Sequence, residues 1–143
     1  MKKIIGVLAV ALWLVGAFYF VQAQSAQEPL PVATCDLFTQ ASPNDVLVVL
    51  VGEEQCGACR AATNRVFTPI WEHYKADNRV KVRKMILAPK SPVPACLEKF
   101  DISMVPVMLV VRGGQEMWKQ VGLRKDDIDA TKQRIITEVD RLK

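Results

Sequence analysis

The run VLVVLVGEEQCGAC, residues 46–59, decides the fold of this 143-residue chain. Its first half is aliphatic without polar alternation, which is typical of a central strand covered on both faces. Gly52 ends that run, and apolar residues recur at three- and four-residue steps from Cys56 onward, which predicts a helix of about twenty residues. Pro69 lies within this helix and predicts a kink. We therefore expect a buried strand that is followed by a Cys-x-x-Cys pair at the start of a helix.

The rest of the chain predicts an α/β domain in which further strands and helices alternate. Thr34 can cap a short helix that ends near Gln40, before a turn. Prolines between residues 88 and 94 exclude regular structure there, and one of them fits the first turn of a short helix over residues 94–100. Strands are expected at residues 79–87, 107–111 and 116–121, and a final amphipathic helix begins at Asp126 or Asp127.

The first 23 residues have the layout of a secretory signal. Lys2 and Lys3 precede an uncharged apolar run over residues 4–21, and small residues before a polar stretch fit cleavage after Ala23. The alternative is an uncleaved anchor, because the apolar run reaches the lower limit for spanning a bilayer. Both interpretations place the remaining chain outside the cytoplasm, in a periplasmic or otherwise exported location, either free or anchored to the inner membrane.

The domain is expected to begin after a linker. Residues 24–33 are polar and contain two prolines, which predicts a flexible tether before a single domain over residues 34–143. Without residues 1–23 the chain has 17 basic and 15 acidic residues, a net charge of +2. Because the two signs alternate, we expect neither nucleic acid nor an anionic membrane surface as a partner, and membrane contact only through residues 4–21 if they are retained.

Four cysteines lie in the exported part, where disulfides can persist. Cys56 and Cys59 are so close that a bridge between them adds little chain-entropy stabilisation, whereas a bridge from Cys35 to Cys96 would close a long loop. One pair therefore suits redox chemistry and the other a structural role.

The Cys-x-x-Cys spacing suits reversible dithiol chemistry. Free N–H groups of the first helical turn favour a negative sulfur, so the pKa of Cys56 should fall from about 8.5 toward roughly 3.5 to 7.5. Cys59 lies one turn deeper and can resolve a mixed disulfide. Gly57 leaves the approach open, and Ala58 has no group that could relay a proton. The pair therefore predicts a thiol exchange site.

Metal and haem sites are less compatible with this pattern. A structural zinc ion needs four ligands, and the other sulfurs are the separate Cys35 and Cys96. Haem attachment requires histidine directly after Cys59, where Arg60 stands. The single histidine, His73, falls in the middle of the helix and suits a surface or helix-packing role. We expect no cofactor and no metal.

These features together resemble the thioredoxin superfamily over residues 45–143. The resemblance implies a thioredoxin-like fold with a central mixed sheet of about four strands flanked by helices. It further implies that the Val105–Pro106 bond is cis and lies across from Cys56, where the backbone beside the proline aligns a substrate chain. The similar segments are residues 47–51, the motif at residues 56–59, Pro69-Ile70, residues 102–109, residues 110–115 and Val121-Gly122.

Two departures from the family pattern concern proton handling. Gln55 stands where typical members have tryptophan, and Leu50 stands where thioredoxins have a buried acid. Glu53, Glu54 or Lys84 could move the proton instead, although each also fits a solvated surface charge.

Cys35 and Cys96 lie outside the family motif. By the resemblance, both fall on helices on the same side of the sheet, so a bridge between them is geometrically possible. Two buried thiols, or a second redox pair that passes electrons to a partner, remain alternatives.

The expected function is thiol–disulfide exchange on cysteine-containing proteins of the cell envelope, recharged by an upstream redox partner. Cys56 would form the mixed disulfide and Cys59 would resolve it. The Gly57-Ala58 dipeptide has no group that further stabilises a thiolate, which favours a reductant. Two alternatives remain: a binding or assembly module with a static bridge, and a metallochaperone that holds copper(I) between the two thiolates.

Overall fold

The computed structural model describes residues 29–143, which form a four-stranded mixed sheet. The strand order is β2-β1-β3-β4; β2 runs parallel to β1, whereas β3 is antiparallel to both β1 and β4. Helices alternate with strands in the order that the sequence predicts, which confirms the α/β architecture. The strands are β1 (Val46–Gly52), β2 (Val80–Ile86), β3 (Val107–Arg112) and β4 (Gln115–Val121).

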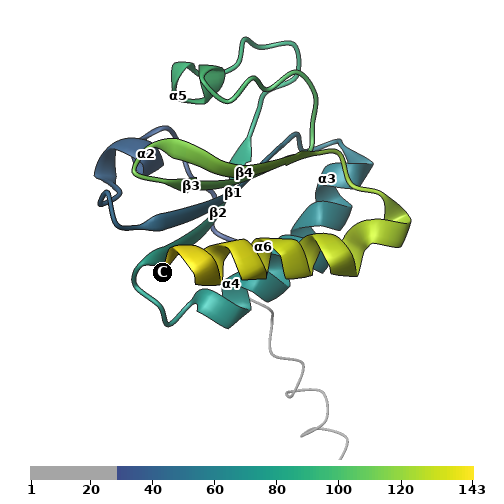
Figure 1. Ribbon diagram of the computed structural model, residues 1–143. Coiled ribbons are helices and arrows are strands. Elements are labelled where there is room, and N and C mark those ends of the chain that lie inside the picture. Colours follow the sequence, from purple (N-terminus) through teal and green to yellow (C-terminus); the bar gives the residue numbers. More distant parts are fainter. Residues whose placement is uncertain (1–28) are drawn as a thin grey trace, which may run out of the picture.

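Helices cover both faces of the sheet (Figure 1). The short helices α2 (Asp36–Gln40) and α5 (Ala95–Glu98) lie on one face. The other face carries a long helical run and the C-terminal helix α6 (Ile128–Leu142), which follows the short 3-10 helix η2 (Lys125–Asp127). Each face therefore has its own hydrophobic cluster.

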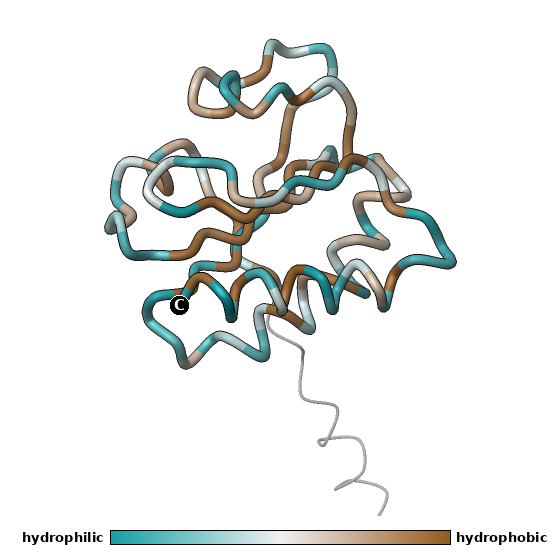
Figure 2. The backbone as a smooth tube through the Cα atoms, viewed as in Figure 1, coloured by the Kyte–Doolittle hydropathy of each residue, from teal (hydrophilic) through white to brown (hydrophobic). Residues whose placement is uncertain are grey.

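Strand β1 is the centre of the molecule, and all seven of its residues are buried. Val48 and Leu50 point into the cluster under the long helices, whereas Leu47 and Val49 point into the cluster under α2 and α5. Figure 2 shows the resulting hydrophobic band through the middle of the sheet. The unbroken aliphatic run is explained by this burial on both faces.

The helix after the cysteine pair is distorted just before Pro69. It begins as α3 (Gly57–Ala62), widens into the π-helical turn η1 (Thr63–Phe67) and continues as α4 (Thr68–Tyr74). The Thr68 N–H donates to the Thr63 carbonyl, five residues back. Because proline has no N–H and its ring would clash with the carbonyl four residues earlier, a widened turn accommodates it. The kink predicted from Pro69 is therefore a π-helical turn in the structure.

The predicted flexible linker over residues 24–33 is wrong for its last residues. The Leu30 side chain is only 4% exposed and packs into the cluster under the long helices. The Lys84 N–H donates to the Pro31 carbonyl at 2.9 Å, and the Ala33 N–H donates to the Lys84 carbonyl at 2.8 Å. Two prolines suggested a tether, but one buried leucine and a single backbone bridge hold this segment against β2.

The predictions for residues 1–23, a cleaved signal or a membrane anchor, lie outside the described residues, as does most of the linker. Across residues 29–143, no helix is both long and apolar enough to cross a membrane.

Candidate active site

The site lies at the end of the sheet where β1 stops. Gly52 pairs with Ile86 of β2, and Val107 at the start of β3 pairs with Val51. The Gly122 N–H donates to the Pro106 carbonyl at 2.8 Å, which continues the ladder between β3 and β4 by one step. The fold thus brings the cysteine pair, Pro106 and Gly122 to the same end of the sheet.

Cys56 and Cys59 are joined by a disulfide, with Cα atoms 5.1 Å apart. Cys56 is the N-cap of α3, and the backbone N–H of Cys59 donates to the Cys56 sulfur at 3.1 Å. Cys56 is half-buried, whereas Cys59 is only 4% exposed. An incoming sulfur can therefore approach Cys56 more easily than Cys59.

Gly52 provides the space that Cys59 occupies. A Cβ atom built on Gly52 would lie 3.0 Å from the Cys59 Cβ and 3.2 Å from its sulfur. These separations are tighter than nine in ten real Cβ contacts, so Cys59 would have to shift by a few tenths of an ångström to admit a side chain here. The close approach of Cys59 therefore favours glycine at this position, where the sequence indicated only the end of the strand.

At position 50, where the resemblance places a buried acid near Cys59, this chain has no ionisable group. Leu50 is buried in the core, and Lys84 pairs with it on the neighbouring strand. Within residues 29–143 no hydrogen bond joins Glu53, Glu54 or Lys84 to either cysteine through a side chain. The Thr63 hydroxyl donates to the Cys59 carbonyl at 2.9 Å. This threonine was missed from sequence, because a hydroxyl four residues along a helix gives no specific signal.

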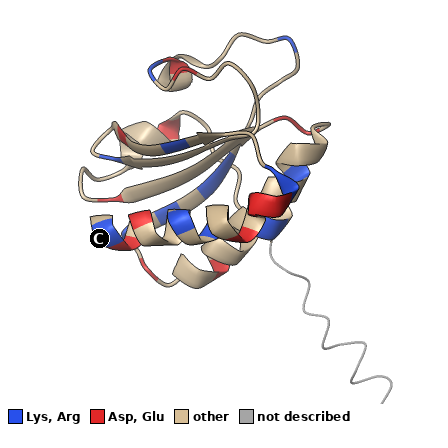
Figure 3. Ribbon diagram, turned by 45° about the vertical axis from the view of Figure 1, so that its right-hand side comes forward, with Lys and Arg blue, Asp and Glu red and all other residues tan. Residues whose placement is uncertain are grey.

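Charged residues lie along α6 and in the loop that leads to Cys56. Figure 3 shows both signs of charge along α6 and acidic residues in the loop between β1 and α3. Glu53 in that loop is half-buried and Glu54 is exposed. These carboxylates therefore lie close in sequence to Cys56 but remain accessible to water.

The segment before β3 has the conformation that the resemblance implied, because the Val105–Pro106 peptide bond is cis. Pro106 is buried, and Val105 is half-buried. Within residues 29–143 no hydrogen bond engages the N–H or the C=O of Val105. Met104 precedes it with 61% of its surface exposed. The N–H and the C=O of Val105 are therefore left without a partner among residues 29–143.

Cys35 and Cys96 are joined by the second disulfide, with Cα atoms 5.6 Å apart. The bridge, which the sequence left open among alternatives, connects the N-cap of α2 to α5. Both cysteines pack against the cluster under α2 and α5, whereas the Gly52 contact places Cys59 on the other face. The two disulfides thus lie on opposite sides of the sheet.

His73 is exposed, and its ring packs edge-on against Tyr74 with centroids 4.6 Å apart. This agrees with the surface and helix-packing role expected from sequence. Within residues 29–143, no three side chains of the His, Cys, Asp and Glu types gather in a geometry that could hold a metal ion.

Two solved structures with a similar fold are thioredoxins. A single-site mutant of thioredoxin from Halobacterium salinarum NRC-1 is 25% identical, with a TM-score of 0.54 over 80% of this chain and 94% of that one. Thioredoxin f from spinach chloroplast is 16% identical, with a TM-score of 0.56 over 74% and 85% of the two chains. This protein has a thioredoxin-like fold.

A curated sequence agrees with the thioredoxin-like assignment. Thioredoxin of Chlamydia muridarum (strain MoPn / Nigg) is 26% identical over 96 residues, which cover 67% of this chain and 87% of that protein. No family model matches the chain. Together with the Cys56–Cys59 pair, these similarities support the thioredoxin superfamily and thiol–disulfide oxidoreductase activity.

Proposed function

We propose that this thioredoxin-like protein reduces disulfide bonds in cysteine-containing proteins outside the cytoplasm. The observation that carries the proposal is the asymmetry of the cysteine pair: Cys56 is accessible at a helix start and accepts the Cys59 N–H, while Cys59 is buried behind it. A donated N–H and the positive end of a helix stabilise a thiolate more than a thiol. In the reduced protein Cys56 is therefore the nucleophile.

The exchange proceeds in two balanced steps. The Cys56 thiolate attacks one sulfur of the substrate disulfide; a new S–S bond forms, the substrate bond breaks, and the released substrate thiolate takes a proton. Cys59 then loses its proton and attacks the Cys56 sulfur, which releases the second substrate thiol. The substrate has gained two electrons, and the protein is left with the Cys56–Cys59 disulfide that the structure contains. A reduced dithiol partner upstream returns the electrons.

The segment beside Pro106 supports an extended polypeptide as the substrate. The unpaired N–H and C=O of Val105 can bond to a chain laid alongside, as in strand addition. Apolar side chains of Ile86, Met104 and Val121 are exposed at the same end of the sheet. A substrate with apolar residues beside its cysteine would bury this surface.

Reduction is the favoured direction because little stabilises the thiolate beyond the helix start. Gly57 and Ala58 are exposed and have no side-chain donor. The strongest oxidants of this chemistry owe their potential to a highly stabilised reduced form, which such a dipeptide does not provide. The location outside the cytoplasm is supported by the signal-like residues 1–23.

The proposal is tested by insulin reduction with Cys56→Ser as the control. Wild-type protein with dithiothreitol should precipitate insulin faster than dithiothreitol alone, and C56S should remove this acceleration because the nucleophile is lost. Cys59→Ala should accumulate mixed disulfides with native partners, which mass spectrometry identifies along with their compartment. Equal insulin rates for wild type and C56S would favour the binding module instead.

The copper(I) alternative has its own measurement. Reduced wild-type protein is titrated with copper(I) in the presence of a competing chelator, with the double variant C56S/C59S as the control. Binding that needs both cysteines, combined with absent insulin reduction, would replace the redox proposal by metal transfer.

A further inference from the structure

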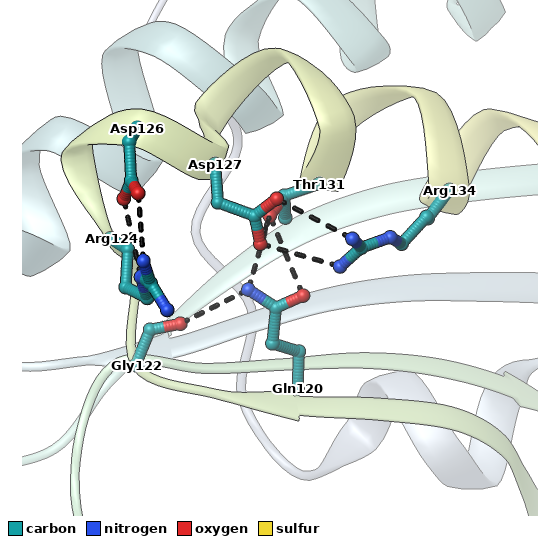
Figure 4. A network of polar contacts seen from close by, with 7 residues as sticks. All are labelled: Gln120, Gly122, Arg124, Asp126, Asp127, Thr131 and Arg134. Carbon is teal, nitrogen blue, oxygen red and sulfur yellow. Dashed lines mark hydrogen bonds and ion pairs between the residues drawn. The ribbon is translucent and has the colours of Figure 1, made fainter.

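A polar network connects the end of β4 to the start of α6, next to the proposed substrate segment (Figure 4). The Gln120 side-chain amide donates to the Thr131 hydroxyl at 3.1 Å and to the Gly122 carbonyl at 3.4 Å. The Thr131 hydroxyl donates to the Asp127 carboxylate at 3.3 Å. Arg134 completes the network through an ion pair with Asp127, also at 3.3 Å.

Thr131 is the buried centre of this network, with 0% of its surface exposed. A buried hydroxyl is costly unless it is hydrogen-bonded, so its place among apolar neighbours calls for these partners. Gln120 faces the same side of the sheet, since its backbone partner Met108 belongs to the cluster under α6. The network therefore passes from α6 through the sheet face to the turn after β4.

Both the C=O and the N–H of Gly122 are hydrogen-bonded. Its carbonyl accepts from Gln120, and its N–H donates to the Pro106 carbonyl at 2.8 Å. Its φ of +77° is a conformation that favours glycine, so the backbone here depends on the residue type and on these bonds. The Pro106 carbonyl belongs to the peptide group that links Pro106 to Val107, the first residue of β3. The orientation of this peptide group is thereby coupled through Gly122 to Gln120 and Thr131.

We propose that Gln120 and Thr131 are positioning residues for polypeptide substrates, acting through Gly122 on the Val105–Pro106 segment. This inference rests on the proposed function, because it assigns a role in aligning the chain that Cys56 attacks. In the described part of the chain neither side chain hydrogen-bonds to a cysteine, so thiol reactivity toward a small reagent should not depend on them. The alignment of a polypeptide substrate, in contrast, should depend on them.

The test compares Thr131→Val with Thr131→Ser and with wild type. Valine keeps the volume of threonine but removes the hydroxyl, whereas serine keeps the hydroxyl. We expect T131V to raise KM for insulin about five-fold, the cost of one net hydrogen bond, and to leave kcat within about two-fold. T131S should restore KM. The rate of reduced Cys56 with the small disulfide DTNB should match wild type in both variants.

Amide hydrogen exchange supplies a readout that does not require turnover. In T131V the Gly122 amide should exchange faster, while amides at the centre of β1 keep their wild-type protection. If T131V does not fold, Gln120→Met serves in its place, because it removes both polar atoms from a half-buried side chain of similar shape.

The outcomes separate this inference from the proposed function. Unchanged KM and unchanged Gly122 exchange, in a variant that reduces insulin normally, would overturn the positioning role alone. Equal losses with insulin and DTNB, not rescued by T131S, would also overturn it and indicate general destabilisation. Absence of insulin reduction in the wild type would overturn the proposed function and with it this dependent inference.

Discussion

The two disulfides of this molecule differ in sequence separation and in the side of the sheet on which they lie. Cys56 and Cys59 are three residues apart at an open helix start, whereas Cys35 and Cys96 are separated by 61 residues and clamp α2 to α5. By the chain-entropy relation, the short bridge restricts the unfolded chain less than the long one does. The same covalent bond therefore suits exchange in one place and stability in the other.

The two disulfides also differ in the groups that surround their sulfur atoms. Cys56 has a backbone N–H directed at its sulfur and belongs to the end of the sheet where Val105 leaves its backbone unpaired. Cys35 and Cys96 are half-buried against an apolar cluster that includes Leu97 and Phe100. A sulfur becomes useful for exchange where charge on it is stabilised and a partner can reach it.

The largest expected effect is on stability, from removal of the long bridge. The double variant Cys35→Ser/Cys96→Ser should lose about 4 kcal/mol of unfolding free energy by the chain-entropy relation for a loop of this length, against about 2 kcal/mol for C56S/C59S. Urea unfolding monitored by circular dichroism measures both. The first variant should keep insulin reduction at low temperature; loss of activity without loss of stability would mean that Cys35 and Cys96 take part in exchange.

A smaller effect is expected at the glycine beneath Cys59. Gly52→Ala forces a Cβ into the space of the Cys59 side chain and should cost about 1 to 3 kcal/mol in both oxidation states, as overpacking does. Gly57→Ala is the matched control, because a Cβ there meets nothing within 4 Å. Thermal unfolding of the oxidised and reduced proteins measures the change. Equal stability of the two variants would show that the Cys59 contact is not tight.

The smallest effect is expected far from both bridges. Burial raises the pKa of Tyr74, and its hydroxyl donates to Asp140 at 2.8 Å, which lowers the pKa of that carboxyl below its ordinary 3.8. Tyr74→Phe should cost about 1 kcal/mol at neutral pH. A carboxyl with a lowered pKa stabilises the fold above its ordinary pKa and loses that contribution as pH falls through the folded value.

The pH dependence is therefore the check on Tyr74→Phe. The stability difference between Y74F and wild type should be largest near pH 7 and shrink below about pH 4, in urea titrations at each pH. If the stability difference between Y74F and wild type stays constant into the acid range, Asp140 does not contribute to it. Y74F should leave the reactivity of both disulfides unchanged.

Much of the fold could be predicted from sequence because its signals are local. The aliphatic run of β1, the proline at the start of α5 and the glycine hairpin after β3 each specify their element within a few residues. The cysteine pair is likewise a local motif whose position after a buried strand gives it meaning.

What could not be predicted depends on contacts between distant residues. The packing of Leu30 and the bond from Gln120 to Thr131 each join side chains that no spacing rule connects. The tight contact between Gly52 and Cys59 also arises only when α3 folds back over the end of β1. Such features follow from tertiary packing and have no period in the sequence.

The bridge between Val32 and Lys84 covers part of the outer edge of the sheet. Strand β2 is an outer strand, and uncovered outer strands recruit further strands and promote aggregation. The protein covers part of this edge with its own backbone and places the charged Lys81 and Arg83 along the rest, which opposes the addition of a further strand on this side of the sheet.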